Sequence, residues 1–374
     1  MSEKRDERKV DRERGGAGFE AFADLAGERL GGAVLWANDD FFAAKERLIR
    51  AGEPVWREGV YTERGKWMDG WETRRRRQPG HDVCLLRLAG AGVVRGVVVD
   101  TRFFRGNHPE ACTLEGADLS AVRGGSPRLD ELRGGEVDWR PLVPRSPLGG
   151  DALHRFAVGD GRAGDGDDGD GARRVTHLRF SIFPDGGVAR LRVHGEPRPD
   201  WPALAARREV DLAAALLGGR VLAASDAFFG RGDHLLAPGP PRGMHDGWET
   251  RRKRGRQPDD PHDWIVVRLA RPGRLHRVVV DTSFFKGNAP GSCGVEGCAA
   301  GEYASDRAAP WRPLVPRTPL EPHRVHELAV AGDAAVATVS HLRLSIFPDG
   351  GVARLRAFGT FGGAVGGGDG GGPA

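Results

Sequence analysis

The sequence Ser181-Ile-Phe-Pro-Asp-Gly-Gly-Val-Ala-Arg-Leu-Arg192 occurs twice in this chain, and its second copy runs letter for letter from Ser345 to Arg356. Three further strings are duplicated in the same order. Their first copies are Asp69-Gly-Trp-Glu-Thr-Arg-Arg75, Val97-Val-Val-Asp-Thr101 and Trp139-Arg-Pro-Leu-Val-Pro-Arg145, and their second copies begin at Asp246, Val278 and Trp311. Four ordered matches indicate a tandem duplication of one domain.

The length fits this interpretation, because 374 residues suit two domains that each bury a core. Two copies are fewer than the three or so repeats that a solenoid needs. We predict a first repeat over residues 19–194, a link over 195–202 and a second repeat over 203–360. The charged start, residues 1–18, and the Gly-rich end, residues 361–374, are expected to be disordered.

The pattern inside each repeat is that of β-structure. Thr176–Ile182 and Ala189–His194 alternate with period two, and the Pro184-Asp-Gly-Gly sequence between them is typical of a hairpin turn. A short helix is expected only at the start of each repeat, ending at Gly31-Gly32 and Gly218-Gly219. Many short strands with Gly/Pro turns predict an all-β antiparallel sandwich or jelly roll. The absence of strand–helix alternation and of a Gly-rich phosphate loop excludes a Rossmann fold.

Charge and cysteine content narrow the class of protein. Lys and Arg number 56 against 52 acids, and acids are interspersed around the Arg74–Arg77 and Arg251–Arg254 clusters, so we expect no nucleic-acid partner. No apolar run approaches the length that a membrane-spanning helix needs. None of the four cysteines forms a CxxC pair, and Cys112 and Cys293 fall at equivalent positions, so we expect them to pack in the core. These features predict a soluble, cytoplasmic protein.

The first repeat is longer than the second. The segment from Val97 to Trp139 is longer than its counterpart from Val278 to Trp311. A second insertion, Asp160–Asp170, alternates Asp with Gly but lacks the spacing and closing Glu of an EF-hand, so we interpret it as a solvated loop.

The motifs resemble one family closely. Asp39-Asp-Phe-Phe42, Arg64–Arg75, Gly80-His-Asp82 and Asp100-Thr-Arg-Phe-Phe-Arg-Gly-Asn107, with their second copies, are similar to allantoicase, or allantoate amidinohydrolase. The resemblance spans about residues 19 to 360. It implies two jelly-roll repeats related to galactose-binding-like domains. It also implies hydrolysis of allantoate to ureidoglycolate and urea in purine breakdown, and we expect a homo-oligomer.

This reaction needs a donor for the substrate carboxylate, a general acid or base, and polar groups that orient the ureido amides. The candidate catalytic residues are Asp69, Glu72, Asp100 and His81. The candidate substrate-binding residues are Lys66, Arg74, Arg75, Asn107 and His177. Their counterparts in the second repeat are Asp246, Glu249, Arg251, Arg252, His262, Asp281, Asn288 and His341.

Other interpretations stay open at this level. Trp71 and Trp248 are best read as core residues, the acids near them as part of a salt-bridged turn, and the strand histidines as structural. Lys66-Trp67-Met68 is Gly243-Met244-His245 in the second repeat, which favours one dominant site, or a site between repeats, over one site per repeat. No cofactor is identifiable, and without HxH, HExxH or CxxC spacing no metal ligand is assigned. The competing functions are a tandem carbohydrate-binding module without catalysis and a hydrolase of a related ureide.

Overall fold

The computed structural model describes residues 18–120, 128–135, 137–159, 173–254, 262–299, 301, 308–330, 332 and 337–362. The chain divides into two compact units, Met1–Arg198 and Pro199–Ala374, each holding one copy of the duplicated strings. The division falls inside the predicted link, whose exact limits stay a prediction. Most of the two expected disordered tails, and the whole Asp160–Asp170 insertion, lie outside the described residues.

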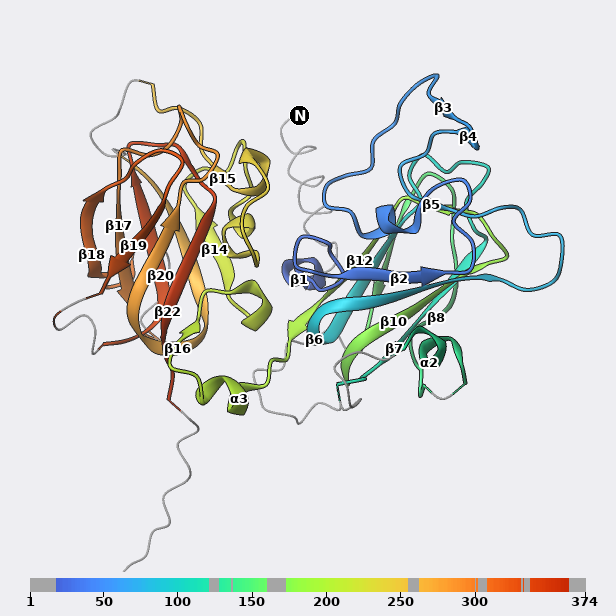
Figure 1. The fold of residues 1–374 in the computed structure, drawn as a ribbon, viewed down its shortest axis with the longest axis horizontal. Coiled ribbons are helices and arrows are strands. Elements are labelled where there is room, and N and C mark those ends of the chain that lie inside the picture. The colour runs from blue at the N-terminus through green and yellow to red at the C-terminus, as the bar shows by residue number, and fades with distance from the viewer. Residues whose placement is uncertain are drawn as a thin grey trace, which may run out of the picture. The chain divides into compact units, whose positions relative to one another are not determined.

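The first unit is built almost entirely of strands (Figure 1). Its strands are β1 (Ala23–Asp24), β2 (Ala33–Ala37), β3 (Tyr61–Thr62), β4 (Gly65–Lys66), β5 (Trp71–Glu72), β6 (Asp82–Asp100), β7 (Ala111–Ala117), β8 (Arg140–Pro147), β9 (Leu153–Ala157), β10 (Arg174–Phe183), β11 (Gly187–Val188) and β12 (Arg190–Pro197). Its helices are the 3-10 turns η1 (Gly18–Ala21) and η2 (Lys45–Ile49) and the single α-helix α2 (Leu129–Arg133) among the described residues.

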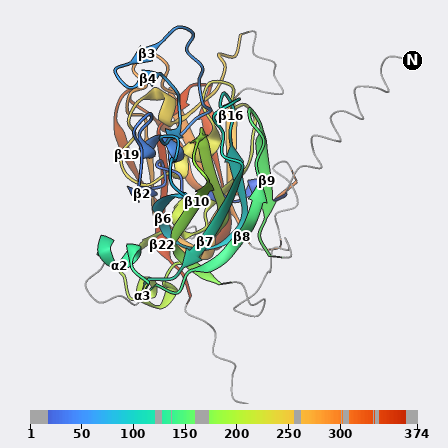
Figure 2. The same cartoon turned by 90° about the vertical axis from the view of Figure 1, so that its right-hand side faces the viewer.

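Strand β6 is 19 residues long and belongs to one hydrogen-bonded set of eight antiparallel strands, in which its two halves pair with different strands. Its first half pairs with β2 and β10, and β10 continues to β7 and β8. Its second half pairs with β12 and β9, and β12 continues to β1. Figure 2 shows β6, β10, β7 and β8 side by side. Two antiparallel layers that share one long strand and enclose a core form the expected jelly-roll sandwich.

The second unit repeats this topology. Its strands are β13 (Val210–Asp211), β14 (Arg220–Ala224), β15 (Trp248–Glu249), β16 (Asp263–Asp281), β17 (Ser292–Cys298), β18 (Arg312–Pro319), β19 (Val325–Ala329), β20 (Thr338–Phe347), β21 (Gly351–Val352) and β22 (Arg354–Thr360). Its helices are α3 (Trp201–Ala205), η3 (Ala215–Leu217), η4 (Gly232–Leu236) and η5 (Met244–Asp246). Strand β16 takes the place of β6, since it pairs with β14 and β20 at one end and with β22 and β19 at the other.

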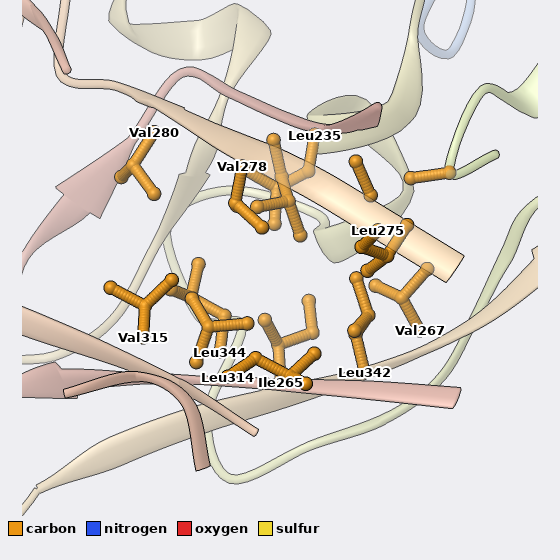
Figure 3. Close-up of a cluster of buried hydrophobic side chains, with 14 of the residues drawn as sticks. Leu235, Ile265, Val267, Leu275, Val278, Val280, Leu314, Val315, Leu342 and Leu344 are labelled. Atoms are coloured by element: carbon orange, nitrogen blue, oxygen red, sulfur yellow. The ribbon is translucent and has the colours of Figure 1, made fainter. Parts of the chain in front are cut away.

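The core of each repeat follows the period-two pattern of its strands. In β10, Leu178, Phe180 and Ile182 are fully buried, whereas Arg179 between them is partly exposed. Figure 3 shows the same arrangement in the second repeat, where Ile265, Val267, Leu342 and Leu344 lie side by side on adjacent strands and face Val278 and Leu235 across the cluster.

The expected hairpin at Pro184-Asp-Gly-Gly is wrong. Strands β10 and β12 follow one another along the chain, but β6 lies between them in the sheet, and β16 lies between β20 and β22 in the same way. The expected core positions of two cysteines are confirmed. Cys112 and Cys293 are buried on β7 and β17, and burial raises the pKa of both thiols to about 12. None of the described helices is long and apolar enough to cross a membrane.

The expected opening helix is wrong in the first repeat. Residues 25–31 form turns, and Gly31 has a φ of 106°. In the second repeat only the three residues of η3 are helical, capped by Gly218 at a φ of 109°. The Gly-Gly sequence is therefore a true turn signal, because glycine adopts positive φ at little cost, but it does not require a preceding α-helix.

Candidate active site

The short strand β5 places the two most informative side chains of the first repeat on opposite sides of the backbone. Trp71 points into the core with none of its surface exposed, and its indole Nε1 donates to the Asp39 carbonyl at 2.8 Å. Trp248 is equally buried and donates to the Asp226 carbonyl at 2.7 Å. The interpretation of both tryptophans as core residues is confirmed. Successive side chains of a strand point to opposite faces, so Glu72 lies on the side away from this core.

Glu72 is a buried carboxyl without a cationic partner among the described residues. It is 9% exposed, and its Oε1 accepts a hydrogen bond from Asn107 Nδ2 at 2.7 Å. Burial raises the pKa of Glu72, and the Asn107 hydrogen bond only partly opposes this shift. A desolvated carboxyl held by a neutral donor is the arrangement that general acid–base chemistry uses.

The second repeat keeps the pair but not its burial. Asn288 Nδ2 donates to Glu249 Oε1 at 2.6 Å, while Glu249 is partly exposed. The loops that hold the asparagines are also alike, because Gly187 donates to the Asn107 carbonyl and Gly351 to that of Asn288. Both repeats therefore hold a glutamate–asparagine pair at the same place. The first repeat shields its glutamate from water more completely, although Asn107 is exposed and Asn288 is partly buried.

Asp69, by contrast, is tied into a buried ion pair. Its Oδ2 lies 2.7 Å from Arg190 NH2 and also accepts the Val55 amide at 3.0 Å. Burial opposes ionisation of Asp69, but these bonds outweigh it and the pKa is lowered. The Arg190 guanidinium also donates to the carbonyls of Asp69 and Ala189. Asp246 and Arg354 form the same 2.7 Å pair in the second repeat. This ion pair connects β12 to the loop before β5 and so positions Glu72 indirectly.

Asp100 forms a different ion pair, with Arg102, and the second repeat has a serine at the position of that arginine. It accepts two hydrogen bonds of 3.0 Å from Arg102 Nε and one of 2.6 Å from Arg102 NH2. Glu53 contacts the same guanidinium. In the second repeat Ser283 stands in place of Arg102, and Asp281 accepts its backbone amide at 2.7 Å. Asp100 therefore serves to hold Arg102 and the loop around Glu53.

That loop carries a hairpin, β3–β4, that projects from one end of the first repeat (Figures 1 and 2). Trp56 stacks on Phe103 with ring centroids 6.0 Å apart, and Lys66 Nζ lies 4.1 Å from the centroid of the Trp56 ring. Lys66 pairs with no carboxylate among the described residues. In the second repeat η5 occupies the segment before β15, and the described residues there contain no hairpin of this kind. The two repeats thus differ in the segment that leads into β5 and β15, the strands that carry Glu72 and Glu249.

The consecutive arginines after β5 have different surroundings. Arg74 Nε binds Asp39 Oδ2 at 2.7 Å, and Arg251 binds Asp226 at the same distance. Arg75 and Arg252 pair with no acid in the part of the chain that the structure describes. The expected salt-bridged turn is therefore real for Arg74, whereas Arg75 offers its guanidinium to other partners.

Neither candidate histidine of the first repeat is hydrogen-bonded to Glu72, whose side chain is held by Asn107. His81 and His262 each stack on a phenylalanine, Phe183 and Phe347, at 4.7 Å, and burial lowers the pKa of His81. His177 lies toward the other end of β10, roughly 20 Å of strand before Phe183 and the turn where β5 pairs. Its Nδ1 contacts Thr176 Oγ1 at 2.9 Å, and His341 contacts Ser340 in the same way. Burial lowers the pKa of both rings.

Three residues near the candidate site were missed by the sequence reasoning. Arg190 has a signal, since it belongs to the duplicated Ala-Arg-Leu-Arg sequence, and Asp39 belongs to the Asp-Asp-Phe-Phe motif. Arg102 is marked by a difference between the repeats instead, since Ser283 stands at its position in an otherwise similar loop. No cluster of three or more His, Cys, Asp or Glu side chains fit to hold a metal ion occurs in the described part of the chain.

Two jelly rolls in tandem, each with a glutamate–asparagine pair whose carboxyl is buried or half-buried, define a duplicated β-sandwich protein with a carboxyl-based candidate site. The family model named Allantoicase repeat matches residues 23–198 and 210–362. The chain is 45% identical to a probable allantoicase of Pseudomonas aeruginosa, over 92% of this chain and 97% of the relative. It is 41% identical to one of Photobacterium profundum, over 91% and 97%.

A solved structure agrees. The crystal structure of allantoicase from Saccharomyces cerevisiae superposes with a TM-score of 0.73, at 33% identity, covering 90% of this chain and 92% of the yeast chain. The chain belongs to the allantoicase family.

Proposed function

We propose that the protein hydrolyses allantoate to ureidoglycolate and urea. Allantoate carries one carboxylate and two ureido groups on a single carbon. Hydrolysis forms a bond from that carbon to the oxygen of water and breaks its bond to one ureido nitrogen. The water loses a proton and the departing nitrogen gains one, so the reaction needs a group that moves a proton over a short distance.

Glu72 is the proposed proton carrier, and its burial beside Asn107 is the observation that carries the proposal. In its ionised form it accepts a proton from water, and in its protonated form it delivers that proton to the leaving nitrogen. The raised pKa of Glu72 brings its two forms closer in free energy near neutral pH than those of an exposed glutamate. Asn107 holds one carboxyl oxygen and so fixes the direction in which the other oxygen acts.

The substrate carboxylate needs a cation that is not already paired. Lys66 and Arg75 meet this condition among the described residues, whereas the Arg74 guanidinium is occupied by Asp39. Lys66 belongs to the hairpin loop that distinguishes the first repeat. We therefore propose that the first repeat holds the dominant site and that Lys66 binds the substrate carboxylate, with Arg75 beside it.

The cellular setting is part of the same proposal. The four cysteines are buried free thiols, which supports a reducing compartment such as the cytoplasm. Phe228 and Phe229 are 66% and 61% exposed, which supports self-association into a homo-oligomer. The proposed partner is the small substrate, with neither nucleic acid nor a membrane involved.

The test is to incubate the purified chain with allantoate and measure urea, with ureidoglycolate and galactose as parallel ligands. We expect urea from allantoate. Urea from ureidoglycolate alone would assign a related ureide hydrolase. Galactose binding without urea release, by folded protein with and without divalent metals, would assign a carbohydrate-binding module and refute the proposal.

A further inference from the structure

A cavity of about 980 Å³ lies on the outer face of the first repeat, on the sheet formed by β2, β6, β10, β7 and β8. Leu85, Thr113 and Ser181 form its floor, because the residues next to them on each strand point into the core. Helix α2 and strand β8, with Arg145, supply further lining residues. Its volume falls within the range of about 300–1,000 Å³ that is usual for small-molecule sites.

Helix α2 lies in the connection between β7 and β8, which is longer in the first repeat than in the second. That connection covers residues 118–139, whereas the shorter one in the second repeat covers residues 299–311. Leu132 is only 2% exposed, and the Arg133 guanidinium lies 4.7 Å from the centroid of the Trp36 ring. These contacts hold α2 against the sheet, so the cavity has a fixed wall.

The cations of the cavity are not equivalent. Arg179 is neutralised by Glu115 through two bonds of 2.6 and 2.9 Å. Arg133 faces Asp130 at 3.9 Å. Arg145 pairs with no acid among the described residues, and its guanidinium lies 4.4 Å from the centroid of the Phe183 ring. That ring fixes the position of the guanidinium while leaving its N–H donors unused. Arg145 is therefore the cation available to a ligand.

The second repeat shows why Arg145 is available. Its counterpart, Arg317, also lies on a phenylalanine ring, at 4.1 Å, but its Nε donates to Ser292 Oγ at 2.9 Å. Ser292 opens β17 as Ala111 opens β7, so the first repeat has no hydroxyl at this position. Thr113 is likewise replaced by Gly294. Two differences thus release an arginine and add a hydroxyl in the first repeat.

Two hydroxyls on the floor are also unused. Neither Thr113 nor Ser181 makes a side-chain hydrogen bond to another described residue, and both line the same cavity as Arg145. The nearby Asn38 is occupied, since its carboxamide bonds to the Val83 amide and to Asp82. A planar guanidinium with two neighbouring hydroxyl donors matches the two oxygens of a carboxylate.

We propose that this cavity is a binding site for a small organic carboxylate, anchored by Arg145 and hydrogen-bonded by Thr113 and Ser181. His81, a catalytic candidate from the sequence, also lines the cavity, but the site uses neither Glu72 nor Asn107 and so stands independently of the proposed proton transfer.

The experiment is calorimetric titration of the full chain with citrate, succinate and benzoate as separate probes. At least one probe is expected to bind saturably, and Arg145→Gln should weaken that binding at least about tenfold. Arg317→Gln is the matched control and should leave it within about twofold. Ala111→Ser offers Arg145 the hydroxyl that Ser292 offers Arg317, so it should also weaken binding.

Three results would overturn the inference. The first is no saturable heat from any of the probes on folded chain. The second is equal weakening by Arg145→Gln and Arg317→Gln. The third is binding of inorganic phosphate as tight as that of the best carboxylate, which would make the site a general anion site. Urea release by Arg145→Gln is measured in parallel and is expected to match the unaltered chain, so loss of this site is distinguishable from loss of catalysis.

Discussion

Glu72→Gln separates the catalytic and the structural roles of the buried carboxyl. Glutamine has nearly the same size, and its carbonyl oxygen still accepts the bond that Asn107 Nδ2 makes to Glu72 at 2.7 Å. The folding loss should therefore stay within the net worth of one hydrogen bond, about 1 kcal/mol. The variant cannot carry a proton, so turnover should fall at least about a hundredfold, which is about 2.7 kcal/mol of activation free energy.

Glu249→Gln is the matched control. It makes the same change at a 2.6 Å bond to Asn288, in a carboxyl that is less buried and has no hairpin of the β3–β4 kind among the described residues beside it. We expect a loss of less than about tenfold, smaller than the hundredfold or more expected from loss of a proton carrier. Initial rates of urea release give kcat and KM for both variants, and circular dichroism with thermal melts checks folding. Full activity of Glu72→Gln would make the carboxyl structural. Equal loss in both folded variants would place a working site in each repeat.

The raised pKa of Glu72 adds two pH signatures. Because the carrier begins each cycle ionised, kcat/KM of the unaltered chain should rise with pH through a pKa above the usual glutamate value, and Glu72→Gln should lack this limb. The contribution of Glu72 to the free energy of unfolding changes with pH in the opposite sense to kcat/KM, because it falls as pH rises. A carboxyl whose pKa is raised by folding favours the folded state below its unfolded pKa and loses this contribution as pH rises through its folded pKa. The variant should therefore gain stability relative to the unaltered chain over that window.

Three further predictions concern the surroundings of this carboxyl. Arg190→Met leaves Asp69 charged and buried without its partner, so it should lower the free energy of unfolding by about 3–5 kcal/mol in urea titrations; adding Asp69→Leu should recover most of the loss, and no recovery would contradict a paired role. Asn107→Asp places a second carboxyl 2.7 Å from Glu72. Like charge disfavours ionisation, so the acidic limb of kcat/KM should move to higher pH, and an unmoved limb would show that Glu72 does not set it. Deleting residues 160–170, which the second repeat lacks, should leave the melting temperature and urea release nearly unchanged, whereas a large loss of either would assign that loop to the site or to an interface.

The sequence was sufficient for the fold because the duplicated strings coincide with the elements that build it. The string from Ser181 contains the end of β10, a turn and the start of β12, and the Trp71 position was correctly assigned to the core. Alternation and turn chemistry are local signals, so they can be read in one sequence. The short opening helix was predicted wrongly because Gly-Gly marks a turn equally well after a helix or within a loop.

The contacts of the candidate site were harder to predict from the sequence than the fold, and the reason is physical. Asp69 and Arg190 are 121 positions apart, and nothing local in the sequence says which arginine neutralises which acid. Glu72 differs from the exposed acids only in its burial, which depends on how loops from distant positions close around it. The comparison between repeats was the one sequence signal that reached this level, since it singled out Lys66 and the loop before β5 as different.

The 19-residue strand β6 determines where the chain can be divided into fragments that fold. It supplies partners to four other strands, two along each half, so neither layer of a repeat can assemble while β6 is unformed. A repeat should accordingly unfold in one step, and a break within β6 should abolish both layers at once. Separation near Arg198 interrupts no such strand. We therefore expect the smallest fragment of this protein that folds alone to be a whole repeat.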